Sequence, residues 1–562
     1  MAGLGGQPML ILREGARRER GKEAMANNIM AARAVAGAVR STLGPKGMDK
    51  LLVDTIGDVT ITNDGVTILR EMEVEHPAAK MVVEAAKAQN DEVGDGTTTV
   101  ALLVGELLKK AENLMDQGVH PTMIVLGYKM ASEKAIEVLD QMGMDVSVKN
   151  RDLLEKIALT AMTGKLAGSA HVKMAEHVVD MVTALTEEDD DGKMTVDLRG
   201  GVIVEKRAGE GIEDSELIEG IIVDRNRVHS NMPKKVKNPK ILLLGAPIEA
   251  KDTENKAEIS ITNSTQFKMF ANREKEMSRK VADKVIASGA NVVFCQKGID
   301  DIAQSHLAKA GVMALRRIRK TDLKKLAKAT GGNLVTNLEE LTPEDLGEAA
   351  QVEEKKVGGG AMTFVTGFKK EGIFSLLLRG GTQQVVDGLE RALDDALHAV
   401  AAAIEDEKLV AGGGAPEVEL YLKIKEYASS FKGREQLAVA AFAEALAEIP
   451  KALAENSGFD AIDKLTDMKS KHEAGEKTCG LNAYTGEISD MWNMGVVEPL
   501  RVKTQVIKSA TDAANMILRI DDLIASKRTQ QPAGGPPMGG MGGMGGMGGM
   551  PGMGMGGMPG MM

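Results

Sequence analysis

The sequence predicts a multidomain protein whose two ends are mostly α-helical and whose middle is α/β. Its 562 residues are too many for a single domain with one hydrophobic core, since one domain usually holds about 150 residues. Apolar residues recur at three- and four-residue spacing in the first 150 residues and again in the last third, as in helices that bury one face. Between these regions, short apolar runs alternate with helical segments, which is typical of an α/β domain.

The N-terminal region is predicted to combine helices with one hairpin. Periodicity places helices over residues 16–43, 78–88, 98–114 and 122–142. The alternation of Val59 and Ile61, followed by Asn-Asp-Gly, predicts a hairpin or strand-turn. We expect Asp64 at its exposed tip, where the carboxylate could accept a proton or hold a water.

The middle and C-terminal regions continue this pattern. Strands are expected over 240–249 and 290–298, with helices over 300–315 and 320–332, in an α/β domain of residues 220–368. Helical spacing returns over 383–404, 434–456 and 500–526. Residues 529–562 are rich in Gly and Met and cannot offset the entropy of ordering, so a mobile tail is expected.

Composition excludes several classes of protein. The 81 acidic residues outnumber the 70 basic ones, which argues against a general nucleic-acid binder. The most basic window, residues 316–328, contains no aromatic residue; a solvated helix face is favoured over a nucleic-acid or acidic-partner patch. Cys295 and Cys479 form no metal-binding pattern, and no signal peptide or membrane-length apolar run occurs. We therefore expect a cytoplasmic protein with no membrane partner.

The stretch GDGTTT, residues 94–99, has the chemistry of a phosphate site. Gly94 and Gly96 allow a tight backbone turn, and the N–H groups at the start of the following helix favour an anion. The threonines add hydroxyl donors. Asp95 would repel phosphate unless a cation lay between them, so it is a candidate Mg²⁺ ligand. The alternative, a capped helix after a turn, fits the pattern equally well.

Three further glycine-bearing turns accompany this stretch. They are TLGPKG at 42–47, TNDGVT at 62–67 and AGGGAPE at 411–417. Each alone is weak, because such turns are common. Together with VGDGTTT, GREQLAVAAFAEALAEIPKALAENSGFD, GLNAYTGEI and VVEPLRVK they resemble the chaperonins, and most closely the archaeal group II chaperonins, the thermosomes. The resemblance runs in order along essentially the whole chain and includes the Gly/Met tail.

The resemblance implies a chaperonin-like fold of three domains. A mostly helical equatorial ATP-binding domain would comprise residues 1–150 and 405–528, and a small intermediate hinge domain 151–219 and 369–404. Residues 220–368 would form an α/β apical domain that binds substrate, with a helical protrusion at about 248–285 as a built-in lid. Within the protrusion, Phe267, Met269 and Phe270 either touch unfolded clients or neighbouring lid tips, or pack beneath the segment.

The resemblance also assigns the residues that bind ATP and its metal. Asp95 would hold Mg²⁺, with K⁺ as a further candidate cation. Asn482 and Ala483 would meet the base, and Glu498 the ribose. The remaining nucleotide contacts would be Leu43, Gly44, Pro45, Gly96, Thr97, Thr98, Thr99 and Gly413.

Hydrolysis would require a water oriented by Asp64 and by an acid of RALDDALHAV. Periodicity does not separate Asp394 from Asp395, but the family's acid directly before ALHA selects Asp395. Either residue could otherwise be a solvated acid on a helix. Lys165 resembles a family lysine that approaches the γ-phosphate, although the LAGSA that follows departs from the family's pattern.

The function implied is that of an ATPase and ATP-dependent chaperone that encloses unfolded proteins in a chamber. The subunits would form a homo- or hetero-oligomeric double ring, taken as eight-fold, without nucleic acid and without the separate lid protein of group I chaperonins. The alternatives are a non-chaperone ATPase or kinase that uses the same site, and a structural ring with an inactive site. No second motif for a phosphoryl acceptor is visible, and the complete set of acids disfavours the inactive ring.

Overall fold

The computed structural model describes residues 17–147, 150–165, 170–249, 264–368 and 372–525. These residues form two compact units. One contains the antiparallel pair of β1 (Arg17–Arg20) and β22 (Asp522–Ala525). The other contains the described residues from Gly21 to Asp521. The Gly/Met tail and residues 250–263 of the predicted protrusion lie outside the described part of the chain.

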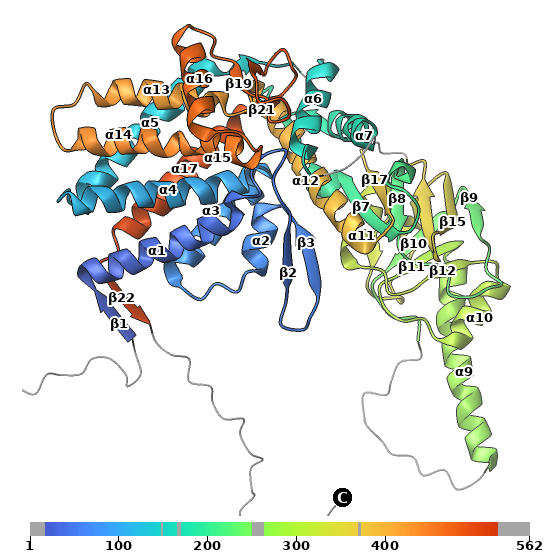
Figure 1. The fold of residues 1–562 in the computed structure, drawn as a ribbon. Helices are drawn as coiled ribbons and strands as arrows, with labels where there is room; N and C mark the ends of the chain where they lie inside the picture. Colours follow the sequence, from blue (N-terminus) through green and yellow to red (C-terminus); the bar gives the residue numbers. More distant parts are fainter. Residues whose placement is uncertain (1–16, 148–149, 166–169, 250–263, 369–371, 526–562) are drawn as a thin grey trace, which may run out of the picture. The chain divides into compact units, whose positions relative to one another are not determined.

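Helices from both halves of the chain pack into one body around α4 (Thr97–Asp116) (Figure 1). Every residue of α4 from Val100 to Leu108 is buried, as expected for a central helix that is apolar on all sides. Gly105 allows the first helix, which carries Ala36, to pack close against α4, since a Cβ at Gly105 would lie 2.4 Å from Ala36 Cβ. The helices that pack against α4 include α1 (Gly21–Arg40), α3 (Pro77–Val93), α5 (Pro121–Met142), α14 (Glu435–Leu446) and α17 (Leu500–Leu518). Helix α13 (Ala415–Ala428) packs against α14 and α5.

Shorter elements complete this helical region. A hairpin is formed by β2 (Lys50–Val53) and β3 (Val59–Thr62), and a small sheet has the order β21-β18-β4. The strands of that sheet are β4 (Met144–Asp145), β18 (Lys408–Ala411) and β21 (Val497–Pro499). The remaining elements are α2 (Gly65–Glu71), α15 (Glu448–Asn456), α16 (Ala461–Glu473), β19 (Cys479–Leu481) and β20 (Ile488–Asp490).

A second core forms around α12 (Gln383–Asp406). The apolar stripe of α12, formed by Leu389, Leu393, Ala396 and Val400, is fully buried. This stripe packs against α6 (Arg151–Met162) and α7 (Ala170–Ala184). Next to this core lie β5 (Thr186–Glu188), β6 (Met194–Val196) and the short α8 (Leu198–Gly201).

The middle of the chain contains two sheets, of which the sequence predicted one. The first has the order β12-β11-β10-β13, all parallel, with β14 antiparallel to β10. Its strands are β10 (Lys240–Leu244), β11 (Val292–Cys295), β12 (Met313–Leu315), β13 (Leu334–Val335) and β14 (Gly347–Glu348). Its helices are α9 (Ser264–Ala287), α10 (Asp301–Lys309) and α11 (Lys320–Thr330).

The second sheet has six strands in the order β7-β17-β8-β16-β15-β9. The strands are β7 (Val202–Ala208), β8 (Glu216–Val223), β9 (Lys235–Lys237), β15 (Gln351–Val357), β16 (Gly360–Thr366) and β17 (Phe374–Gly380). The predicted boundary between residues 219 and 220 therefore falls inside β8. Adjacent strands of one sheet come from both sides of that boundary.

Several predicted elements were wrong in extent. The helix expected over 16–43 is a strand followed by α1, because β1 pairs with β22 at the other end of the chain. For the same reason the helix expected over 500–526 ends at Leu518. The segment 300–315 is helical only to Lys309; Gly311 has a left-handed φ of 75° and a parallel strand follows. The segment 434–456 forms two helices that meet at Ala447.

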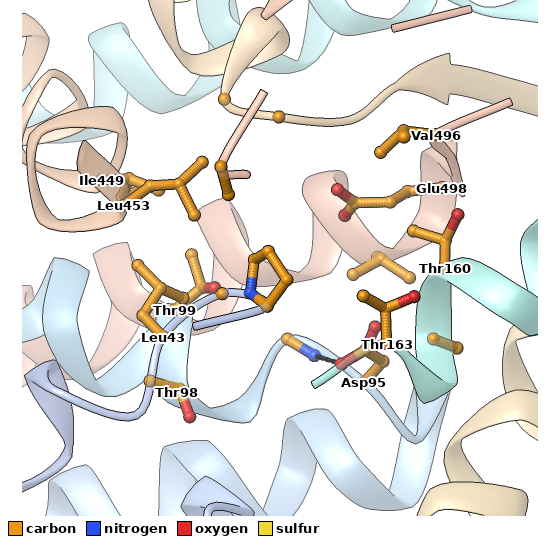
Figure 2. Close-up of a pocket in the computed structure, with 18 of the residues that line it drawn as sticks. Leu43, Asp95, Thr98, Thr99, Thr160, Thr163, Ile449, Leu453, Val496 and Glu498 are labelled. Carbon is orange, nitrogen blue, oxygen red and sulfur yellow. Dashed lines mark hydrogen bonds between the residues drawn. The ribbon is translucent and has the colours of Figure 1, made fainter. Parts of the chain in front are cut away.

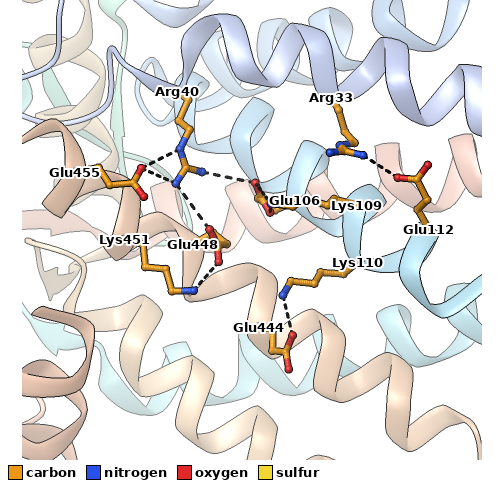
Figure 3. Close-up of polar contacts among 10 residues, drawn as sticks. All are labelled: Arg33, Arg40, Glu106, Lys109, Lys110, Glu112, Glu444, Glu448, Lys451 and Glu455. Carbon is orange, nitrogen blue, oxygen red and sulfur yellow. Dashed lines mark hydrogen bonds and ion pairs between the residues drawn. The ribbon is translucent and has the colours of Figure 1, made fainter. Parts of the chain in front are cut away.

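A network of charged residues joins helices from the two halves of the chain (Figure 3). Arg40 at the end of α1 donates to Glu455 of α15 at 2.9 Å and lies 3.6 Å from Glu106 of α4 and 3.7 Å from Glu448. The Glu106 and Glu448 side chains are only 11% and 13% exposed, so these contacts are less screened than surface pairs. The network fixes the helix that leads into the turn at 42–47.

Candidate functional site

One cavity of about 460 Å³ gathers the motifs found in the sequence. Its lining comes from the turn after α1, the starts of α2 and α4, the end of α6, the β18–α13 turn, α15, the β19–β20 hairpin, β21 and α17. Leu43, Ile449 and Leu453 lie on one side of the cavity, and Val496, Glu498 and Thr160 on the other (Figure 2). The two ends of the chain therefore meet around a single pocket.

The GDGTTT stretch forms the start of α4 at this pocket. Gly94 and Gly96 have left-handed φ values of 79° and 83°, so the backbone turns sharply on both sides of Asp95. Gly96 is the N-cap and supplies no side-chain cap, which leaves the first-turn N–H groups available to an anion. Thr97, Thr98 and Thr99 all line the pocket. The capped-helix alternative is thereby disfavoured, because this helix start lacks a side-chain cap and opens onto a cavity.

Gln89 supports this loop and was missed by sequence reasoning. Its side chain is fully buried on α3, and Nε2 donates to the main-chain carbonyl of Asp95 at 2.8 Å. This bond gives the Asp95 carbonyl a partner and anchors the backbone of the loop to α3. On the other side, the Asp95 carboxylate accepts from Gly96 N at 2.7 Å. A buried glutamine on an apolar helix face, one turn before GDG, was the available signal.

Asp64 lies at the pocket, but not where it was predicted. The hairpin turns at residues 54–58, and Asp64 is instead the N-cap of α2, 8% exposed, with Oδ2 accepting from Thr67 N and Thr67 Oγ1. The expectation of an exposed hairpin tip was therefore wrong, because Asn-Asp-Gly here begins a helix. Asp64 nevertheless lines the cavity, and Gly65 beside it approaches α4 so closely that a Cβ would lie 2.4 Å from Thr98 Oγ1.

Lys165 and Asp395 form an ion pair at the edge of the pocket. Lys165 Nζ donates to Asp395 Oδ2 and lies 3.9 Å from Asp95 Oδ1. The Asp395 side chain is 7% exposed, whereas neighbouring Asp394 is 57% exposed. Burial distinguishes the two acids that periodicity could not separate. Asp395 itself does not line the cavity and meets it through Lys165.

The electrostatics of this cluster raise the pKa of the Asp395 carboxyl group toward neutral pH. Burial raises the pKa of Asp395 to about 8, against the opposing charge of Lys165 and with the help of Asp95 and Asp64. For Lys165, burial alone would lower the pKa, but Asp395, Asp95 and Asp64 outweigh it and raise the pKa. Lys165 therefore stays charged. A carboxylate that titrates near neutrality is suited to general base chemistry.

The turn at 42–47 is held by hydrogen bonds to its backbone. Asn456 Nδ2 donates to the carbonyls of Arg40 and Leu43, each at 2.9 Å. Gly44 has a φ of 86°, and its neighbour Pro45 approaches the loop after α6, where a Cβ on Gly164 would lie 3.0 Å from Pro45 Cα. Asn63 also donates to Gly164 O at 2.8 Å. The loop that carries Lys165 is thus seated on the predicted nucleotide turn.

The part of the cavity formed by Gly413 and residues 481–483 has the composition of a nucleoside site. Gly413 has a φ of 65° and lies against Leu481, whose N–H donates to the Gly413 carbonyl. Asn482 and Ala483 follow, and the Asn482 side chain accepts from the N–H groups of Tyr484 and Thr485. An aromatic base would meet an apolar surface here. Its apolar residues come from both sides of the cavity and are Ile449, Leu453, Met491, Val496, Val502 and Val506.

Two charged residues that line the cavity, Glu417 and Lys503, were also missed. Lys503 Nζ lies 2.7 Å from Glu498 Oε2 and 3.0 Å from Glu417 Oε1. Glu498 was predicted from VVEP, but Lys503 was not assigned a role. Burial raises the pKa of Glu498, against the charge of Lys503. Nothing in the spacing of these residues indicated that they would meet.

Other sequence expectations have mixed outcomes. Met269 of α9 is 68% exposed, while the side chains of Phe267 and Phe270 lie outside the described part of the structure. In the basic window 316–328, Arg319 pairs with Glu205 and Asp322, and Lys328 with Asp197. The other basic residues of the window are exposed except Lys325, which is half-buried. Among the described residues, no group of three metal-ligating side chains occurs, and no helix is long and apolar enough to cross a membrane.

Comparison with known proteins identifies the family. The sequence model of the TCP-1/cpn60 chaperonin family matches residues 35–528. Thermosome subunit beta of Archaeoglobus fulgidus is 55% identical over 96% of this chain and 99% of its own length. A thermosome subunit of Methanopyrus kandleri is also 55% identical, over 93% and 95%.

A solved structure agrees with these relatives. It is the open-state monomer of a group II chaperonin from Methanococcoides burtonii, 52% identical, with a TM-score of 0.59 over 76% of this chain and all of that one. The chain therefore belongs to the TCP-1/cpn60 chaperonins, and within them to the archaeal group II kind, which are ATP-dependent chaperones and ATPases.

Proposed function

We propose that this chain binds Mg-ATP in the cavity described above and uses hydrolysis to close a ring-shaped chamber around unfolded proteins. The observation that carries the proposal is the cavity itself. Motifs from both ends of the chain line it, and Lys165 and Asp395, from the segments between them, meet at its edge. A change at the terminal phosphate would therefore act on both parts of the chain.

The phosphates are assigned to the start of α4. Its uncapped N–H groups and the hydroxyls of Thr97, Thr98 and Thr99 supply donors, and the helix dipole favours an anion there. Leu43, Gly44, Pro45 and Gly96 would surround them. Gly413, Asn482 and Ala483 would hold the nucleoside, with Glu498 at the ribose.

Asp95 fits a Mg²⁺ ligand. Mg²⁺ is usually held by one or two carboxylates together with substrate phosphates, and no group of three ligating side chains is found among the described residues. Asp95 is 31% exposed beside the helix start that would receive the phosphates. The metal, with K⁺ as a further candidate cation, would supply charge neutralisation on the phosphates.

Asp395 and Asp64 are assigned to the attacking water, and Lys165 to the γ-phosphate. Asp395 has the pKa of a base poised near neutrality, and Lys165 is charged. In this structure the Lys165 ammonium group donates a hydrogen bond to the Asp395 carboxylate. A γ-phosphate would compete for the Lys165 ammonium and release the carboxylate to accept a proton from water.

The domain division that the family resemblance implies is part of this proposal, with its boundary at residues 219 and 220 inside β8. We assign residues 1–150 and 405–528 to the equatorial ATP-binding domain, 151–219 and 369–404 to the intermediate hinge, and 220–368 to the apical domain. Lys165 and Asp395 lie in the hinge segments and Asp95 in the equatorial domain, so their contacts would differ between open and closed states. Such differential contacts are what couples hydrolysis to movement.

Assembly into rings is supported by the β2–β3 hairpin. Leu51 pairs with Ile61 and Val53 with Val59, which puts four apolar side chains on one face of a two-stranded ribbon. All four are between 44% and 64% exposed. An apolar face of this kind marks a protein contact, and we propose that it is covered by a neighbouring subunit of a double ring. The number of subunits per ring, taken as eight, belongs to this proposal.

The protrusion at 248–285 is assigned as the lid. α9 forms its described part, and Met269 is exposed on it, as a contact with clients or other lids requires. Deletion of residues 254–269 should abolish closure of the chamber but spare ATP hydrolysis, measured by electron microscopy and phosphate release. A chamber that still closes after this deletion would refute the lid, and a separate lid protein would then be needed.

The chaperone activity is tested with a chemically denatured client. We expect the purified chain to raise its refolding yield with Mg-ATP and not with a non-hydrolysable analogue. ATP hydrolysis with no effect on any client would favour a non-chaperone ATPase instead. We further propose a cytoplasmic location, which suits the two free, buried cysteines, and no nucleic-acid partner.

A further inference from the structure

Lys503 joins three elements of the pocket wall through one ammonium group. It lies on α17, and its Nζ contacts Glu498 of β21 at 2.7 Å and Glu417 of α13 at 3.0 Å. The three side chains are 12%, 20% and 4% exposed. Glu498 and Lys503 both belong to the VVEPLRVK motif and Glu417 to AGGGAPE, and only Glu498 has so far been given a role.

The two carboxylates face different surroundings. The Glu498 carboxylate points into the cavity between the apolar walls (Figure 2). Glu417 follows the Gly412–Gly414 turn and is almost fully buried, and its Oε2 has no hydrogen-bond partner within the described residues. Glu417 is therefore engaged through Lys503 and holds the ammonium from the side opposite Glu498.

The Glu498 carboxylate has no other anchor in the described part of the chain. Its one polar side-chain contact is with Lys503. A glutamate side chain rotates about three bonds, and a carboxylate that accepts from a ligand hydroxyl must be held in one orientation to discriminate. The geometry thus requires a residue that fixes Glu498, and Lys503 is in place to do so.

We propose that Lys503, braced by Glu417, is a positioning residue that holds the Glu498 carboxylate toward the ribose hydroxyls of the nucleotide. This inference rests on the proposed assignment of Glu498 to the ribose. It adds that recognition of ribose over deoxyribose depends on a lysine that need not touch the nucleotide.

The test measures discrimination between ATP and its deoxy analogues by the full-length, assembled protein. Lys503→Met alone would leave Glu417 as an uncompensated buried charge and could prevent folding. The substitution is therefore made in a Glu417→Gln background, with Glu417→Gln alone as reference. KM and kcat are measured for ATP, 2′-deoxy-ATP and 3′-deoxy-ATP.

We expect the reference to prefer ATP to at least one analogue by about tenfold in KM, the value of one well-made hydrogen bond. Adding Lys503→Met should raise KM for ATP, leave KM for that analogue unchanged and leave kcat unchanged for both. The ratio of KM for that analogue to KM for ATP then falls to about one. Lys503→Arg in the native background should keep the preference, and Lys508→Met, at an exposed position of α17, should change nothing.

Non-additivity separates positioning from a structural role. Glu498→Gln should remove the same discrimination, and combining it with Lys503→Met should remove no more, because Lys503 acts through Glu498. Discrimination that survives Lys503→Met, or an equal loss of kcat for all three nucleotides, overturns the role of Lys503 and leaves the ribose assignment standing. If neither the native protein nor Glu498→Gln distinguishes the analogues, the ribose assignment fails, and the role of Lys503 fails with it.

Discussion

At the scale of single residues, burial gives information that the sequence pattern lacks. Asp394 and Asp395 are adjacent acids on one helix, and periodicity treats them alike. In the fold, Asp395 faces Lys165 in a buried cluster while Asp394 is exposed. For Asp64 the pattern predicted a residue of the site but the wrong backbone structure. Asn-Asp-Gly occurs both in hairpin turns and at helix starts, and here Asp64 is the N-cap of α2.

Asp395→Ala should retain ATP binding but lose most turnover. Loss of a general base lowers the rate by about 100-fold or more, whereas binding depends on the phosphate and nucleoside contacts. Nucleotide binding by calorimetry and phosphate release under saturating ATP are the two measurements. Asp394→Ala is the matched control and should behave as the native protein. Equal loss of binding and turnover in Asp395→Ala contradicts the assigned role.

The pH dependence of kcat/KM should report Asp395 in the free protein. The base must be ionised, and its pKa is raised to about 8, so kcat/KM should rise with pH through that region. Lys165 lowers the pKa of Asp395, so Lys165→Met should move this rise to higher pH as well as reduce activity. The measurement is the pH profile of kcat/KM for the native protein and for Lys165→Met. A rise at the same pH in both would show that another group is titrating.

At the scale of elements, the sequence predicted helices well where one face is apolar, and failed where distant segments pair. α4 and α12 lie where periodicity put them. β1 and β22 were predicted as the ends of helices. They pair with one another from opposite ends of the chain, and such a long-range pairing leaves no pattern in the local sequence. The six-stranded sheet was missed for a related reason, because its strands come from three separate stretches of the chain.

The α3–α4 connection depends on Gln89, so Gln89→Met should weaken Mg-ATP binding. Methionine keeps the volume but removes the donor to the Asp95 carbonyl. A buried carbonyl without its donor costs about 1–3 kcal/mol, which would appear as a rise in KM of about tenfold. Steady-state kinetics at several Mg²⁺ concentrations measure it. Gln505→Met on α17 is the control, and an unchanged KM in Gln89→Met would rule out the support role.

The β2–β3 hairpin should be needed for assembly. Leu51→Asn places a polar group on its exposed apolar face and should shift the protein toward smaller species, measured by light scattering after size exclusion. Thr60→Asn is the control, because Thr60 pairs with Leu52 on the opposite face of the ribbon. Rings that persist in Leu51→Asn, or that are lost equally in Thr60→Asn, would contradict the contact.

At the scale of the whole molecule, ordered motifs predicted the family and the residues that the proposal assigns to the nucleotide. Nearly every residue assigned from the resemblance lines one cavity, and Asp395 reaches it through Lys165. Supporting residues such as Gln89, Asn456 and Lys503 could not be predicted, because they act through a backbone carbonyl or through contacts that depend on how separate elements pack. Side-chain types in a motif indicate chemistry, while the residues that hold them depend on packing.

The central claim is that the two ends of the chain bind a nucleotide whose hydrolysis moves the segments between them. Electron cryomicroscopy of the purified protein, with and without hydrolysable Mg-ATP, tests it most directly. We predict double rings in both states, nucleotide density beside Asp95 and Thr97–Thr99, and a closed chamber with Lys165 moved from Asp395 toward the γ-phosphate position. Rings that bind and cleave ATP with this ion pair and the hinge unchanged, or nucleotide bound elsewhere, would contradict the account.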